Sequence, residues 1–182
     1  HLLAHWVRAA ALRGLGREAD ALEDLEACSA AGGEAVVGAA LPETLASLAW
    51  SLGRVDVAAA GAERALLLDP TRAYACEVRI RALVALDQVD DAVLLLTDVL
   101  QRDDAAGDLA NLVGDLPQDT PSEVGIRLAS SVLDVFPDHP VALWSRGTLL
   151  ARLDRLSDAL ADLDRCADVA GGAPFEAELY EV

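Results

Sequence analysis

A short sequence motif, a turn followed by the start of a helix, recurs along the chain at a nearly constant spacing. The turn residues Gly53 and Asp87 are separated by about 34 residues, one period, and Asp154 follows Asp87 after roughly two periods. Gly16 precedes Gly53 by one period with a three-residue insertion. A chain of this kind folds as an array of similar units, so we expect its function on a surface, not in a pocket of catalytic groups.

Helices are the units that this composition favours. Apolar residues make up 53% of the 182 residues and are mostly Ala and Leu, whereas aromatic residues are only 4%. Each period holds two amphipathic segments of about a dozen residues on either side of a short turn, the spacing of an antiparallel helix pair. The sequence therefore predicts an all-α fold.

Helix stops and apolar stripes indicate where the repeats begin and end. The predicted repeats are 1–33, 39–70, 71–104, 105–137 and 140–172, within one solenoid domain over residues 1–182. In the last of them, the second helix is expected to bury Leu156, Ala159, Leu160, Leu163 and Cys166. Residues 173–182 are interpreted as a C-terminal tail or the start of a further helix. The insertion in 30–42 predicts a longer connector or an extended helix.

The fourth repeat is degenerate. The stretch from Asp103 to Pro121 carries several Asp residues, two Gly and prolines at 117 and 121. Its apolar residues, Leu109, Leu112 and Val113, predict only a short first helix. The segment Ser122–Phe136 predicts a regular second one, which Pro137 stops.

The chain resembles the tetratricopeptide repeat (TPR) family, whose repeat unit has small residues at positions 8, 20 and 27 and a glycine near 15. Gly53, Ala58 and Ala65 match that pattern, and Gly147 and Ala159 match it in the last repeat. Two repeats depart from it with Asp at position 15, and most of the family's bulky aromatic residues are aliphatic here. The resemblance implies a right-handed superhelical solenoid, and a non-enzymatic scaffold that binds a peptide or protein segment in a concave groove.

Family geometry also implies which residues line that groove. The first helices of the repeats contribute all three tryptophans, an aromatic hydroxyl and several charges: Trp6, Arg13, Trp50, Tyr74, Glu77, Arg81, Trp144 and Arg152. Aromatic residues interleaved with arginines are typical anchors of a protein interface. An alternative stays open, in which the tryptophans fill spaces between helices or cover the narrow end of the superhelix.

The net charge of the chain limits the kinds of partner that it can bind. Fourteen Arg, no Lys and 31 acidic residues give a net charge of −17, which speaks against nucleic acids and anionic membranes and favours a neutral or basic peptide. The absence of lysine also speaks against the clamp with which some relatives grip acidic chaperone tails. Acidic clusters such as Asp162–Asp164 are interpreted as solvated helix faces, and the acidity could serve only to keep those faces soluble.

Catalytic, metal and cofactor sites are not predicted. His1 and His5 are spaced i, i+4, but no acidic or cysteine ligand accompanies them in sequence. No phosphate-binding or dinucleotide-binding glycine motif occurs. Cys28, Cys76 and Cys166 are interpreted as small packing residues, and their odd number favours reduced thiols and a cytoplasmic location.

Several expectations concern the biological setting. The chain begins at His1, which favours a piece of a longer polypeptide, and its composition without Lys or Met is typical of a GC-rich bacterial genome. No apolar stretch approaches the roughly 20 residues that a membrane span needs. Two alternatives to a peptide-binding scaffold remain: a regulatory or docking domain of a larger enzyme or transcription regulator, and a self-association module.

Overall fold

The computed structural model describes residues 2–102, 107–117 and 119–171. The chain divides into two compact units, His1–Gln88 and Val89–Val182, and each is described by itself. The division falls at the turn inside the predicted third repeat, so the single domain over 1–182 stays a prediction. His1 and the predicted tail, 173–182, lie outside the described residues.

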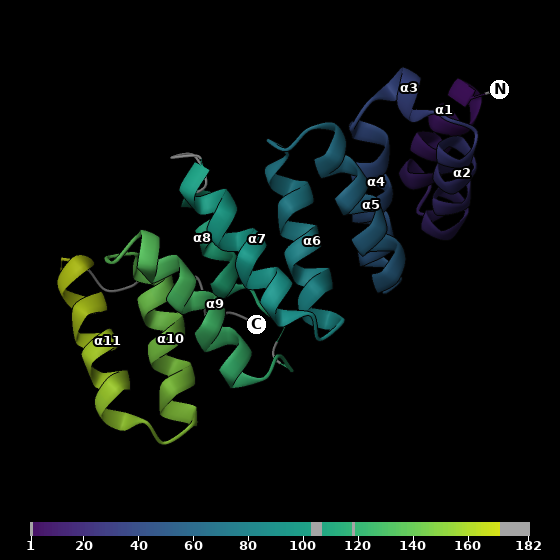
Figure 1. Ribbon diagram of the computed structural model, residues 1–182. Coiled ribbons are helices and arrows are strands. Elements are labelled where there is room, and N and C mark those ends of the chain that lie inside the picture. Colours follow the sequence, from purple (N-terminus) through teal and green to yellow (C-terminus); the bar gives the residue numbers. More distant parts are fainter. Residues whose placement is uncertain (1, 103–106, 118, 172–182) are drawn as a thin grey trace. The chain divides into compact units, whose positions relative to one another are not determined.

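Unit 1 consists of antiparallel helices that pack in sequence order (Figure 1). Its elements are α1 (Leu2–Gly14), α2 (Glu18–Ala30), α3 (Glu34–Val37), α4 (Ala40–Ser51), α5 (Val55–Leu68) and α6 (Ala73–Ala85). The pairs α1–α2 and α4–α5 are the predicted first two repeats, and α6 is the first helix of the third. The insertion between the first two repeats contains the short helix α3 and the start of α4.

Unit 2 starts with the second helix of the third repeat. Its elements are α7 (Val89–Arg102), α8 (Gly107–Ala110), the 3-10 helix η2 (Asn111–Gly114), α9 (Ser122–Val135), α10 (Pro140–Arg152) and α11 (Leu156–Val169). The fourth repeat is degenerate as predicted, because α8 and η2 replace a full first helix. α10 packs against α9, α11 and η2.

The same backbone turn joins the helices of a pair whether its central residue is Gly or Asp. Gly16 and Gly53 have φ values of 71° and 70°, and Asp87 and Asp154 have 60° and 59°. In each turn the next amide donates to a carbonyl five residues back, for example Arg155 N to Leu150 O at 3.0 Å. Asp is among the few non-glycine residues that adopt this left-handed conformation, so the missing turn glycines leave the repeat intact.

Small residues let the paired helices approach closely, as the repeat pattern predicted. Ala21, Ala58, Ala92 and Ala159 are all buried. At Gly147 an added Cβ would lie 2.9 Å from Cγ of Leu163, closer than real side chains pack. The larger residues around these positions form the cores of the two units.

The first and last helix pairs share an interior that the sequence analysis missed. In both pairs an arginine of the first helix binds an aspartate of the second: Arg8 with Asp24, and Arg146 with Asp162. Both aspartates are buried. The interpretation of Asp162 as part of a solvated face was therefore wrong, because its carboxylate lies between α10 and α11 and is neutralised there.

The cysteines of these two pairs repeat the same contact. The Cys28 thiol donates to Leu2 O and the Cys166 thiol to Pro140 O, each at 3.4 Å. Burial also raises the pKa of the Cys166 thiol. All three cysteines are buried and none forms a disulfide bond, as expected for packing residues.

One predicted apolar stripe is only partly correct. In α11, Ala159 and Cys166 are buried, but Leu156 and Leu160 are each 60% exposed. Among the described elements α11 packs chiefly on α10, so one of its sides faces outward. Within the described residues, no helix is both long enough and apolar enough to cross a membrane.

Candidate functional site

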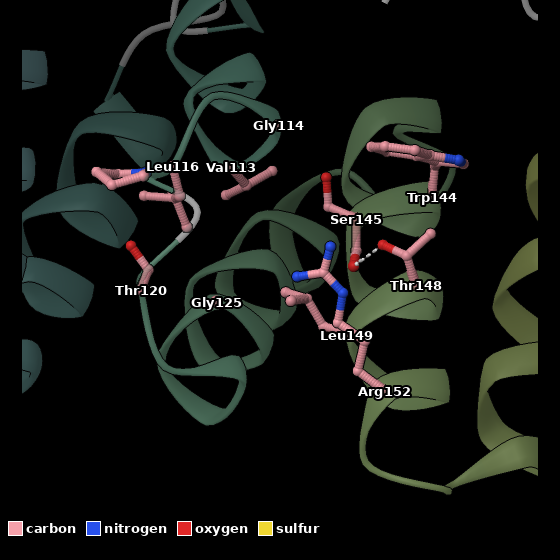
Figure 2. Close-up of a pocket in the computed structure, with 11 residues that line it drawn as sticks. Val113, Gly114, Leu116, Thr120, Gly125, Trp144, Ser145, Thr148, Leu149 and Arg152 are labelled. Carbon is pink, nitrogen blue, oxygen red and sulfur yellow. Dashed lines mark hydrogen bonds between the residues drawn. The ribbon is translucent and has the colours of Figure 1, made fainter. Parts of the chain in front are cut away.

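A pocket of about 210 Å³ opens in unit 2 beside α10 (Figure 2). Its walls come from η2, from the segment that follows η2, from the start of α9 and from one face of α10. The lining residues are Val113, Gly114, Leu116, Pro117, Thr120, Gly125, Trp144, Ser145, Thr148, Leu149 and Arg152. Sites for whole small-molecule ligands start at roughly 300 Å³, so this smaller pocket suits one side chain of a larger partner.

The degenerate fourth repeat creates this pocket. The first helices of the other repeats have 12 or 13 residues, whereas α8 and η2 have four each. Pro117 and Pro121 keep the following segment out of a helix. Gly125 preserves the space, because an added Cβ there would lie 2.5 Å from Cδ1 of Leu149. The face of α10 that a full neighbouring helix would cover is therefore partly open.

A buried hydroxyl without a partner lies in the wall of the pocket. Ser145 is 4% exposed, and its Oγ has no hydrogen-bond partner among the described residues. Figure 2 shows this oxygen pointing toward Val113 and Gly114. Nearby, the Thr148 hydroxyl donates to Ser145 O at 2.9 Å, which leaves its oxygen free to accept. An unsatisfied buried hydroxyl costs free energy of about 1–3 kcal/mol, a cost that a hydrogen-bonding ligand removes.

Arg152 brings an unneutralised positive charge to the pocket. Twelve of the fourteen arginines form ion pairs with carboxylates. Within the described part of the chain, only Arg13 and Arg152 have no such partner. Both are exposed, and both belong to the residues predicted for the groove.

The lining of this pocket also differs in charge from other hollows of the surface. Its described lining residues include no carboxylate. Asp115 and Asp119 belong to the adjoining segment, but they are exposed and do not line the pocket. By contrast, the hollows that contain Asp24, Asp162 or Glu34 each place carboxylates beside arginine. In a chain of net charge −17, a hollow with an arginine and no acid is distinctive.

The tryptophans predicted for the groove lie in different surroundings in the two units. Trp144 lines the pocket, whereas Trp6 and Trp50 are half-buried and pack against the core of unit 1. Arg13 is exposed on α1. The structure thus brings Trp144 and Arg152 together at one pocket.

Three groove residues lie on α6. The exposed Tyr74 places its hydroxyl 3.0 Å from that of Ser47 on α4. Glu77 and Arg81 pair with each other, with 3.0 Å between Arg81 Nη2 and Glu77 Oε1. Their charges therefore largely cancel, and Tyr74 is more exposed than either of them.

The most perturbed carboxylate lies away from the pocket. Asp24 accepts hydrogen bonds from Arg8. Its Oδ1 also lies 2.9 Å from Nδ1 of His5. The Arg8 guanidinium lowers the pKa of Asp24 to about 2, and the bond with His5 adds to this effect. His5, considered above as half of a metal-binding pair, is a partner of this carboxylate. The arrangement is a structural ion pair between α1 and α2.

Sequence analysis missed Ser145 and Gly125 as parts of the site. A signal was present on α10, where Ser145, Thr148 and Arg152 follow one another at i, i+3 and i+7 on one side of the helix. A polar stripe on a helix with an otherwise apolar environment marks a face that is not fully covered. The depth of the pocket depends on η2 and could not be predicted from this spacing.

Comparisons with known proteins identify the fold. No protein-family model matches the sequence, and no curated protein matches it significantly. Among solved structures, MamA is 14% identical, with a TM-score of 0.66 over 100% of this chain and 96% of that chain. A MamA fragment from Desulfovibrio magneticus RS-1 is 17% identical, with a TM-score of 0.60 over 95% of this chain and 97% of that chain.

A third solved structure is described in terms of its binding site. YrrB, described as a TPR protein with an unusual peptide-binding site, is 17% identical. Its TM-score is 0.57 over 90% of this chain and 83% of that chain. At these identities the matches show the fold, and they confirm the predicted all-α, TPR-like class.

Proposed function

Since the chain has a TPR-like fold, we propose that it is a non-enzymatic protein-interaction scaffold that binds a peptide or protein segment. The observation that carries this proposal is the pocket beside α10, where Trp144, a free hydroxyl and an unpaired Arg152 meet at a gap in the repeat. Such aromatic and arginine groups dominate the binding energy of protein interfaces. YrrB, which shares the fold, is itself described as having a peptide-binding site.

Both units contribute residues to the proposed binding surfaces. Unit 1 contributes Trp6, Arg13, Trp50, Tyr74, Glu77 and Arg81, and unit 2 contributes Trp144 and Arg152. Trp6 and Trp50 contribute only the parts that remain exposed, since both are half-buried against the core of unit 1. The overall charge of −17 favours a partner that is neutral or basic as a whole, and not a nucleic acid or a membrane.

The proposed location is the cytoplasm of a bacterium. Three buried cysteines that form no disulfide bond suit a reducing compartment. The composition without lysine supports the bacterial assignment. Identification of the encoding genome and fractionation of its cells test both statements.

Affinity capture from a lysate of the source organism tests the scaffold proposal. The baits are the wild-type chain and the Trp50→Ala/Trp144→Ala variant, after circular dichroism shows that both are folded. Leu67→Ala is the matched control, because Leu67 is 73% exposed and lies on α5, outside the pocket lining. We expect a partner that the wild type and the control retain and the double variant loses. Equal retention by all three would place the interface elsewhere.

Self-association is a second candidate function, supported by the exposed leucines of α11. Leu156 and Leu160 form an apolar strip on a helix whose main described neighbour is α10. A copy of the same chain can stack on an exposed apolar strip of this kind. Sedimentation equilibrium tests this: a dimer that Leu156→Glu/Leu160→Glu converts to a monomer supports it, and a monomeric wild type excludes it. The third alternative, a docking domain of a larger protein, predicts capture of no separate partner.

A further inference from the structure

We propose that the pocket beside α10 anchors an acidic side chain of the bound segment, an Asp or Glu next to an apolar residue. This inference rests on the proposed scaffold function and names the chemistry that the site recognises. The carboxylate would lie between the Arg152 guanidinium and the Ser145 hydroxyl, and the apolar neighbour would pack on Trp144.

Charge is the first argument. An arginine gains most from a carboxylate that it can bind with two parallel hydrogen bonds, and twelve arginines of this chain have a carboxylate partner within the chain. Arg152 lines a pocket without one. Figure 2 shows its guanidinium turned back along α10 toward the middle of the pocket. The missing carboxylate is the one that a partner would bring.

Hydrogen bonding is the second argument. The Ser145 hydroxyl is buried, lacks a partner and can donate its proton to a carboxylate oxygen. Thr148 already donates to Ser145 O, so its oxygen can accept from a backbone N–H of the bound segment. The pocket therefore offers donors for an anion and an acceptor for the main chain beside it. Val113, Leu116 and Leu149 supply apolar walls for the neighbouring side chain.

The internal repeat provides the third argument. When the last helix pair is aligned on the first, Arg146 falls on Arg8 and Cys166 on Cys28. The same alignment relates each polar group of the pocket to an apolar or small residue of α1: Ser145 to Val7, Thr148 to Ala10, and Arg152 to Gly14. The two pairs thus keep the same interior contacts and differ at the three positions that face the pocket. A packing role for α10 alone does not require those polar groups.

The local preference for an acid is compatible with a neutral or basic partner overall. The pocket holds one side chain, whereas most of the acidic residues whose burial is described are exposed on the exterior. A segment with one carboxylate and basic neighbours satisfies both. The site also differs in origin from a lysine-based clamp, since it depends on the short η2 and on three residues of α10.

Selection from a random peptide display library tests the inference on the full chain. We expect enriched peptides to share an Asp or Glu adjacent to an apolar residue. The best synthetic peptide is then titrated by fluorescence anisotropy against wild type, Arg152→Gln and Arg155→Gln. Arg155→Gln is the matched control, because it removes the same charge at a nearby position where the arginine is in an exposed pair with Asp158.

We expect the peptide to lose affinity for Arg152→Gln but not for Arg155→Gln. Arg152→Gln weakens binding about 10-fold or more, as loss of a charge-assisted pair does, and Arg155→Gln changes it less than about 2-fold. Replacing the peptide's Asp or Glu with Asn or Gln weakens binding to wild type but has little further effect on Arg152→Gln, which shows that the two groups interact. Ser145→Ala weakens binding by a smaller factor, and circular dichroism confirms that each variant is folded.

Failures of the two proposals are distinguishable. Enriched peptides without a carboxylate, or peptides that bind Arg152→Gln as tightly as wild type, would overturn the acidic anchor and leave the scaffold function standing. A library that yields no binding peptide would count against peptide recognition as a whole, and against the anchor with it.

Discussion

The first and last helix pairs of this protein have the same interior but different exposed faces. In α1–α2 and in α10–α11, an arginine of the first helix and an aspartate of the second bind between the helices, and the turn has the same left-handed residue. The outer face of α1 carries Val7 and Ala10, whereas the matching face of α10 carries Ser145 and Thr148 beside a pocket. Contacts within a pair therefore specify the repeat, while the face of α10 toward the preceding repeat has acquired a site.

The helix pair α4–α5 has a different pair of residues at the same interior position. Where α1–α2 and α10–α11 have an Arg–Asp pair, α4–α5 have Leu45 and Gly61 at the same spacing. An added Cβ at Gly61 would lie 3.0 Å from Leu45 Cδ2, so the leucine fills the space that the ion pair occupies elsewhere. This position therefore accommodates either an Arg–Asp ion pair or a Leu–Gly contact, provided that both residues belong to the same combination.

A charged residue in place of the small alanine that both helix pairs share should destabilise either pair. Ala21 is fully buried in α2 and Ala159 is 3% exposed in α11. We expect Ala21→Glu and Ala159→Glu each to destabilise its unit by about 3–5 kcal/mol, because a bulky unpaired carboxylate would enter a close helix contact. Thermal unfolding followed by circular dichroism measures this. The exposed control Ala161→Glu should stay within about 0.5 kcal/mol of wild type; a control that falls equally would refute the packing explanation.

Replacing one partner of the Arg146–Asp162 pair should cost less, because Arg146 is partly exposed. Arg146→Leu leaves the Asp162 carboxylate buried without its two hydrogen bonds of 2.7 Å, and we expect a loss of about 2–3 kcal/mol. Arg146→Leu/Asp162→Gly copies the middle repeat and should recover at least half of that loss. Urea unfolding of the three proteins decides it; a double variant no more stable than the single one would show that the alternative interior does not transfer.

Acid should weaken the first pair through Asp24. Its folded pKa of about 2 lies below the ordinary value of 3.8, because Arg8 and His5 bind the charged form. The stability that this shift contributes is present above about pH 4 and is lost as the pH falls toward 2. Asp24→Asn should therefore lower the melting temperature at pH 7 and flatten its fall between pH 4 and 2. An unchanged acid profile would contradict the assignment.

Removing the unpaired hydroxyl from the pocket face should stabilise the free protein. Ser145→Ala is expected to raise the free energy of unfolding by about 1 kcal/mol, because a buried hydroxyl without a partner is deleted. Ser131→Ala is the matched control, since Ser131 is also buried and donates to Leu128 O at 2.8 Å. That change should cost about 0.5–1 kcal/mol. Opposite signs in denaturant titrations support a binding role for Ser145; equal losses contradict it.

Exchanging the turn residues should have the smallest effect. Asp154→Gly relieves the left-handed conformation, for which φ is 59°, and Gly16→Asp imposes it where φ is 71°. We expect a gain of a few tenths of a kcal/mol for the first change and a loss of about 0.5–1 kcal/mol for the second. Melting temperatures of both variants measure the effect. Changes of the same sign would show that the two turns are not equivalent.

The candidate site was accessible to sequence analysis only in part. Trp144 and Arg152 were predicted from their positions in the repeat, and both line the pocket. Arg13 has the same unpaired character but no comparable pocket, and Glu77 and Arg81 neutralise each other. The pairing of charges depends on which helices become neighbours, and the repeat pattern does not specify it.

Local rules were sufficient to predict the helices, their turns and the weak fourth repeat. Those rules are the apolar spacing of a helix, prolines that stop helices, and Gly or Asp where φ is positive. The burial of Asp24 and Asp162, the exposure of Leu160 and the pocket beside α10 became visible only in the packed molecule. Each of these depends on contacts between residues far apart in the chain, because burial and charge neutralisation are properties of the packed neighbours and not of the residue type.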